Sequence, residues 1–212
     1  MNRRTLDIIL SGGGVVMAVL LLIFGLVMVD QANFADDYVA EQLGSQKITF
    51  AAEENLSEEE KTWKPGSDCL TEYAGELMTT GKQAECYANY FIAMHMDRSA
   101  NNAGYPGETY ATMGGIRSGI NAELTAAKDS GADQATIDEL QAKLDAATSL
   151  RSTFQTGETL RGLLLTTYGF SIFGDKAQLA GTVAFVAAGL LVVLAIAGFV
   201  HAFTVKKGNS TA

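Results

Sequence analysis

Two long apolar segments dominate the pattern of hydrophobic and polar positions, one near each end of the chain. Residues 8–29 and residues 179–203 contain no Asp, Glu, Lys or Arg. A helix needs about 20 residues to cross the hydrocarbon core of a membrane, because each residue advances it by about 1.5 Å. Both segments reach this length, so the sequence predicts two transmembrane helices that flank residues 30–178.

The apolar positions of residues 30–178 recur mainly at helical spacing, which predicts a mainly α-helical domain between the two spans. Capping residues, glycines and prolines then divide this region into elements. The predicted order is a helical continuation of the first span to Gly44, an extended piece over 47–50, a loop closed by the turn at Pro65 and Gly66, a helix over 69–78 capped by Asp68, and a helix over 82–98.

A long helical hairpin is predicted next, over residues 108–128 and 134–154. Its joint at 129–133 is short and rich in turn-forming residues, so the two helices are expected to pack antiparallel, as in a coiled coil. The seam consists of Met113, Ile116, Ile120, Leu124 and Ala127 on the first helix and Ile137, Leu140, Leu144, Ala147 and Phe154 on the second. Such a seam is typical of structural core rather than of a ligand site.

A dense apolar block lies between the hairpin and the second span, over residues 160–173. Residues 157–162 are expected to begin a new helix there, and residues 174–176 to interrupt it. The block is too short to cross the bilayer, so we expect it to lie in the outer interface or to contact a partner. Its candidate interaction residues are Leu160, Leu163, Leu164, Tyr168, Phe170 and Phe173.

Both predicted spans carry small residues at helical spacing, which places them in one stripe on each helix. Small side chains let two helix backbones approach closely inside a membrane. The stripe of the first span contains Ser11, Gly14, Ala18 and Gly25, and that of the second contains Gly181, Ala184, Ala188, Ala195, Gly198 and Ala202. These stripes predict close packing, either between the two spans or against another membrane protein.

Positive charges flank the spans on the side of the two termini. Arg3 and Arg4 precede the first span, and Lys206 and Lys207 follow the second. Cationic residues near span ends tend to stay in the cytoplasm. Residues 1–7 and 204–212 are therefore predicted to be cytoplasmic, and residues 30–178 to lie outside. The first span reads as an uncleaved signal anchor, because its apolar run is long and no small-x-small cleavage site follows it.

The region between the spans is strongly acidic. Residues 30–178 hold 11 of the 15 Lys and Arg and 23 of the 24 Asp and Glu, which gives this region a net charge of −12. Nucleic acid and anionic lipid surfaces would both repel such a segment. We therefore expect the partners to be the bilayer and other integral membrane proteins, or a second copy of the chain, and not nucleic acid.

The two cysteines, Cys69 and Cys86, both fall in the region predicted to lie outside the cytoplasm. An oxidising compartment favours a disulfide between them. In the chain-entropy model, a bridge over a loop of this length stabilises the folded state by about 3 kcal/mol.

The run Met94, His95, Met96 is the one candidate metal site, because thioether and imidazole groups suit Cu(I). Consecutive helical residues point about 100° apart, however, so three in a row do not converge on one ion. Core packing is the favoured interpretation of Met94, and no metal or cofactor is predicted. The chain also lacks paired-cysteine zinc spacing, phosphate-binding glycine loops and a nucleophile elbow, so we expect a protein that is not an enzyme.

Three short blocks, together with the two spans, carry a resemblance. Residues 42–50, 84–95 and 160–171 read QLGSQKITF, AECYANYFIAMH and LRGLLLTTYGFS. In this order the chain resembles a family of small actinobacterial two-span envelope proteins of uncharacterised function, some labelled aromatic ring-opening dioxygenases. The resemblance covers about a third of the chain and implies no site residues. The dioxygenase label is not supported, because His95 and His201 are predicted on opposite sides of the membrane.

These patterns favour a non-catalytic membrane protein that acts as an accessory or scaffold component of an envelope complex, such as a respiratory complex. The alternative is an extracytoplasmic ligand-sensing module, because two spans around a helical bundle are also typical of sensor input domains. The short predicted cytoplasmic ends leave no room for an output domain, which favours the first interpretation.

Overall fold

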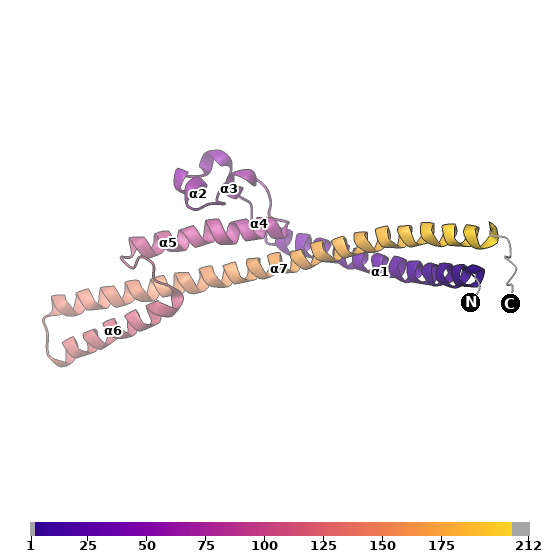
Figure 1. The fold of residues 1–212 in the computed structure, drawn as a ribbon. Coiled ribbons are helices and arrows are strands. Elements are labelled where there is room, and N and C mark those ends of the chain that lie inside the picture. The colour runs from indigo at the N-terminus through magenta and orange to yellow at the C-terminus, as the bar shows by residue number, and fades with distance from the viewer. Residues whose placement is uncertain (1–2, 205–212) are drawn as a thin grey trace. The chain divides into compact units, whose positions relative to one another are not determined.

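The computed structural model describes residues 3–204, and within this range every regular element is helical. The predicted mainly α-helical class is confirmed. In chain order the elements are α1 (Arg3–Ser45), the 3-10 turn η1 (Glu53–Asn55), α2 (Glu58–Thr62), α3 (Cys69–Glu72), α4 (Gly81–Cys86), the π-helical segment η2 (Tyr87–Ile92), α5 (Ala93–Asn102), α6 (Tyr110–Asp129) and α7 (Gln134–Thr204) (Figure 1). Lys206 and Lys207 lie outside the described residues.

The chain divides into two compact units, which share the helices α1 and α7. Among the described residues, the first unit contains 3–38 and 170–204, and the second contains 39–169. The second unit therefore holds the elements from the last turns of α1 to the middle of α7.

The first unit is an antiparallel pair of helices joined through small residues. Early positions of α1 meet late positions of α7: a Cβ placed on Gly14 would lie 3.7 Å from the Cβ of Ala195, and one on Gly174 would lie 3.0 Å from the Cβ of Ala35. The buried small residues recur every seven positions, namely Ser11, Ala18, Gly25 and Ala32 on α1 and Gly174, Gly181, Ala188, Ala195 and Ala202 on α7. A seven-residue repeat is the signature of a coiled-coil seam.

Backbone atoms come close together at the middle of this seam. A Cβ on Gly181 would lie 2.8 Å from the Val29 side chain and 3.0 Å from the Gly25 carbonyl oxygen. Only a residue without a side chain fits such an approach, which increases the dispersion contact between the helices. At one end of the seam, Nδ1 of His201 and Oδ2 of Asp7 are 2.9 Å apart.

Bulky apolar side chains cover the outward faces of the same two helices. In the most apolar 18-residue window of α1 only 11% of residues are buried, and in that of α7 only 17%. Both helices are long and apolar enough to cross a membrane. A core helix of a water-soluble protein would be mostly buried, so their exposure fits a lipid environment.

The second unit contains two apolar clusters. The first gathers Val39, Leu43, Phe50, Leu56, Leu70, Met78, Ala84, Cys86, Ala88 and Leu164. The second joins α5, α6 and α7 through Met96, Ala100, Met113, Ala147, Leu150 and Phe154. Four of the predicted hairpin seam residues are fully or nearly buried, Met113, Leu124, Ala147 and Phe154, and the remaining six are half-buried. Leu150, which is also buried, was not part of the predicted seam.

Local hydrogen bonds set the ends of the hairpin helices. α6 begins with a capping box in which the side chains of Thr109 and Thr112 bond reciprocally to each other's backbone amides. At the start of α7, the Asp133 carboxylate accepts a hydrogen bond from the Thr136 amide at 2.9 Å. This bond is the main reason why the pKa of Asp133 lies below its ordinary value.

The predicted helix boundaries at residues 157–162 and 174–176 are wrong, because α7 runs without a break from Gln134 to Thr204. A glycine inside a helix costs only about 1 kcal/mol relative to alanine. Two of these glycines also accommodate neighbours: a Cβ on Gly157 would collide with the Met96 sulfur, and Gly174 lies against Ala35. Close packing therefore explains glycines that sequence reasoning read as helix ends.

Other differences concern the segment before α5. The predicted helix over 69–78 is limited to α3, and Asp68 makes no side-chain capping bond. The expected loop before Pro65 contains η1 and α2. The predicted extended piece over 47–50 is confirmed only in part: Thr49 forms an isolated antiparallel bridge with Leu77, but Lys47 lies in a turn with a φ of 56°.

The predicted helix over 82–98 is divided into α4, η2 and α5. Within η2, the Ala93 amide bonds to the Ala88 carbonyl, five residues back. The Nε of Arg161 on α7 also donates to this carbonyl oxygen, at 3.0 Å. This second donor comes from a residue 73 positions away, so local periodicity gives no sign of it.

Candidate functional site

The apolar block at 160–173 is part of α7, and its residues do not share one environment. Leu164 was expected to be an interaction residue. In the second unit it is instead buried in the first cluster and is only 4% exposed, so it is not available at the surface. Leu160 and Leu163 are exposed, the latter by 63%. Tyr168 is half-buried.

Aromatic side chains of the first unit gather just beyond the two apolar segments. The rings of Phe34 and Tyr38 stack with centroids 5.9 Å apart, and the Tyr38 ring meets the edge of Phe170 at 6.0 Å. We call these three residues the aromatic cluster. Phe173, one turn further along α7, is 75% exposed. Tyr is one of the residues that are enriched where membrane-spanning helices meet the lipid headgroups, and Tyr38 follows the apolar segment of α1.

The small-residue stripes face each other. Gly181, Ala184, Ala188 and Ala195 are buried, and Gly198 lies against the Ser11 hydroxyl. Of the two arrangements that the sequence left open, the structure contains packing between α1 and α7 of one chain. These residues are therefore not free to bind another protein while the pair is intact.

The predicted disulfide is confirmed. Cys69 and Cys86 are bridged, with their Cα atoms 6.1 Å apart, and the bond connects α3 to the end of α4. Beside it, the Phe50 ring contacts Tyr73 and Tyr87, with centroids 5.6 and 5.4 Å away. The bridge and these rings hold the chain around α3 onto the start of η2.

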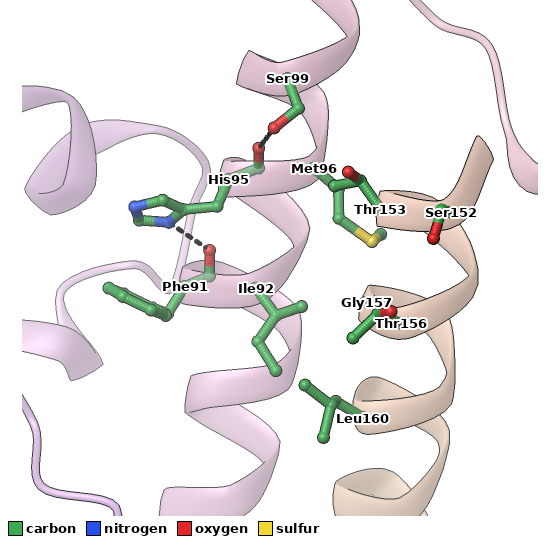
Figure 2. Close-up of a pocket in the computed structure, with 10 residues that line it drawn as sticks. All are labelled: Phe91, Ile92, His95, Met96, Ser99, Ser152, Thr153, Thr156, Gly157 and Leu160. Atoms are coloured by element: carbon green, nitrogen blue, oxygen red, sulfur yellow. Dashed lines mark hydrogen bonds between the residues drawn. The ribbon is translucent and has the colours of Figure 1, made fainter. Parts of the chain in front are cut away.

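The candidate copper ligands do not converge. Met94 is fully buried, Met96 packs in the second cluster towards α7, and His95 leaves the opposite side of α5 (Figure 2). Within residues 3–204 no group of three or more His, Cys, Asp or Glu side chains is close enough to hold a metal ion.

His95 ends a column of rings at four-residue spacing. The Tyr87 and Phe91 rings stack with centroids 4.6 Å apart, and the Phe91 and His95 rings are 4.3 Å apart. Nδ1 of His95 lies 2.9 Å from the Phe91 carbonyl oxygen, which can only accept, so this nitrogen carries the proton and donates it (Figure 2). The other nitrogen, Nε2, faces Oε1 of Glu60 at 3.7 Å.

Glu60 is a buried carboxylate on the short helix α2. Its Oε2 accepts hydrogen bonds from the amide and the hydroxyl of Ser57, both at 2.7 Å. Burial acts to raise the pKa of Glu60, but these hydrogen bonds and the charges of His95 and Arg98 outweigh it, so the pKa lies below its ordinary value. The adjacent Glu59 binds Arg98 at 2.6 Å.

Sequence reasoning missed this group, although one signal was present. Ser57 and Glu60 have the spacing of a capping box, in which a serine is followed three residues later by a glutamate. The contact between Glu60 and His95 joins residues 35 positions apart, and no local pattern predicts it. The pair formed by Asp7 and His201, separated by 194 positions, is of the same kind.

An open groove of about 450 Å³ lies between α7 and the helices η2 and α5. Figure 2 shows Ile92 and Met96 on one side of it, pointing towards α7, and Leu160 on the α7 side. Its remaining lining is Phe91, His95, Ser99, Ser152, Thr153, Thr156 and Gly157. The groove thus combines an apolar floor with several hydroxyl groups.

Comparison with family models, with curated proteins and with solved structures found no match to this chain. The function proposed below therefore rests on the sequence and on the geometry of the described residues.

Proposed function

We propose that the chain is a non-catalytic integral membrane protein and serves as an accessory or scaffold component of an envelope membrane complex, such as a respiratory complex. In this proposal α1 and α7 each cross the membrane, both termini are cytoplasmic, and the second unit lies outside. The resemblance to two-span envelope proteins is part of the same proposal.

The exposed aromatic surface beyond the spans carries this proposal. Phe173 is 75% exposed, and it follows Phe170 of the aromatic cluster by three residues on α7, just before the apolar segment of that helix. Large aromatic side chains dominate the energetics of protein interfaces, because each buries a large area at little cost in conformational freedom. A partner that covers Phe173 would remove this area from water or from the lipid headgroups.

The inner packing of the first unit supports the same proposal. The small-residue stripes are already used between α1 and α7. The surface left for a partner is therefore the outward one, which carries bulky residues. We expect association through the side chains that project from the pair rather than through its seam.

Site-specific photocrosslinking in cells tests the proposal. A photoreactive residue placed at Phe173 should give a discrete crosslinked species of larger mass. A matched control is Phe203, which lies on the same helix near its other end and is 69% exposed. If position 173 gives no protein adduct, or the same adducts as position 203, the scaffold proposal fails.

The groove beside His95 favours a second candidate function, that of a ligand-sensing module. Its apolar floor and hydroxyl rim would suit a small uncharged ligand. Native mass spectrometry should then find a molecule of defined mass on the wild-type protein. Thr156→Trp, which would fill the groove, should lose this molecule. The crosslinks at Phe173 test the scaffold proposal separately.

A further inference from the structure

The segment around α2 contacts α5 through charged side chains. Leu56 is buried at its start, and Ser67 and Leu70 are buried at its end, next to the disulfide. Between Leu56 and Ser67, Glu60 is the only buried residue. A segment with so few buried apolar contacts opens at a lower free-energy cost than the core.

One ion pair and one contact between a carboxylate and a histidine connect this segment to α5. Glu59 binds Arg98 at 2.6 Å, and Glu60 faces His95 at 3.7 Å. The Glu60 side chain is 12% exposed, whereas that of His95 is 40% exposed. A proton can therefore reach His95 from water, while the carboxylate that it faces is largely shielded.

The protonation state of His95 decides whether its contact with Glu60 is attractive or repulsive. The Phe91 carbonyl oxygen fixes the proton of the neutral imidazole on Nδ1, which leaves a lone pair on Nε2. In the neutral form this lone pair faces the Glu60 carboxylate, and the two repel each other. In the imidazolium form an N–H group faces the carboxylate, and the two attract.

Among the described residues, the other charged groups at this contact ordinarily keep their charge between pH 5 and 8. Histidine is the side chain whose ordinary pKa places its charge change between pH 5 and 8. On α2 the facing groups are Glu59 and Glu60, and on α5 the nearby charge is Arg98, none of which changes charge between those pH values. The α7 residues that line the adjacent groove carry no charge. The chain has two histidines, and the other, His201, belongs to the first unit.

We propose that His95 and Glu60 form a pH-sensitive latch, which holds α2 against α5 when His95 is protonated and loosens when it is neutral. The latch regulates access to the surface of α5 beneath α2. The Arg98 pair and the disulfide keep the segment attached at both pH extremes, so the change is a local opening rather than unfolding. This inference does not depend on the proposed scaffold function.

Trp63 makes the latch measurable in the full-length protein in mild detergent. It is the single tryptophan of the chain and directly follows the last residue of α2. Its quenching by acrylamide should increase in one transition as the pH rises from 5 to 8. One partly exposed ion pair should change the ratio of closed to open segment by about threefold.

Variants separate the latch from other effects. His95→Gln and Glu60→Gln should both abolish the transition, whereas His201→Gln, the matched control, should keep it. Far-UV circular dichroism at both pH extremes checks that each variant is folded, and thiol labelling checks that the disulfide is intact. A flat titration of the wild-type protein, or a transition that persists in folded His95→Gln, would overturn the proposal.

Discussion

At positions 25 and 181 the absence of a side chain decides how closely α1 and α7 approach. The Gly25 carbonyl oxygen would lie 3.0 Å from a Cβ on Gly181, and a backbone atom in a helix cannot move aside independently. Gly189, two turns away on α7, has no atom within 4 Å of the corresponding position. Two glycines of one helix therefore have different structural roles.

This difference predicts that Gly181→Leu separates the helix pair and Gly189→Leu does not. Overpacking of this kind costs about 1–3 kcal/mol. A crosslink between cysteines introduced at Gly14 and Ala195, whose Cβ positions are 3.7 Å apart, reports the proximity of the helices. Its yield should fall in the Gly181→Leu background alone. Equal yields in both backgrounds would contradict the close approach.

At the residue scale, the lowered pKa of Glu60 predicts that the stability of the folded protein depends on pH. Its pKa in the folded protein is lowered from the ordinary value of 4.5, so its contribution is fully present above that value and is lost as the pH falls through the lowered one. Glu60→Gln should therefore lose less stability on acidification below about pH 4.5 than the wild-type protein. Denaturant unfolding of the protein at several acidic pH values measures the difference. If Glu60→Gln loses as much stability on acidification as the wild-type protein, the prediction is wrong.

At the element scale, contacts with distant residues modify helices that are regular by sequence. The stretch from α4 to α5 reads as one helix, but it contains the π-helical segment η2, whose Ala88 carbonyl receives a second donor from Arg161. α7 shows the opposite case. Gly157 and Gly174 read as helix breaks, yet the helix continues because both glycines fit against neighbouring side chains.

At the element scale, we predict that removal of the disulfide between α3 and α4 destabilises the second unit. Replacing both Cys69 and Cys86 by serine should lower the free energy of unfolding of the second unit by about 3 kcal/mol, because the unfolded chain regains the freedom of the closed loop. Thermal unfolding followed by circular dichroism would detect the loss. In the wild-type protein, thiol reagents should label these cysteines under denaturing conditions only after reduction. Labelling without a reductant would show that the bridge is absent in the cell.

At the scale of the whole molecule, the two units differ in what their surfaces expose. The first unit presents bulky apolar side chains on both helices, whereas the exposed surface of the α6 and α7 hairpin in the second unit is polar. Such a contrast is the one expected if the first unit lies in lipid and the second in water.

Topology is the prediction that belongs to the whole molecule. Arg3 and Arg4 should keep the N-terminus in the cytoplasm, so a tag there and a tag at the C-terminus should be protected from protease added to intact cells. A tag inserted near Ser130, in the turn between α6 and α7, should be cleaved. Digestion of either terminal tag from outside would reverse the assignment.

The sequence by itself determined the features that depend on local composition and period. The two apolar segments, the helical class, the hairpin seam and the small-residue stripes all follow from residues within one helix. Each of these patterns marks either an apolar helix face that must be buried or an apolar segment long enough to lie in lipid. The cysteine pair was also predictable, because only two cysteines are present.

Only the tertiary structure decided which of these faces meet and which distant residues pair. It placed the stripe of α1 against that of α7, buried Leu164 while it left Leu163 exposed, and brought Glu60 to His95. The physical reason is that a helical period gives the direction of a face but not the identity of its neighbour. That identity depends on backbone approach and on hydrogen bonds between residues far apart in the chain, as at Gly181 and Arg161.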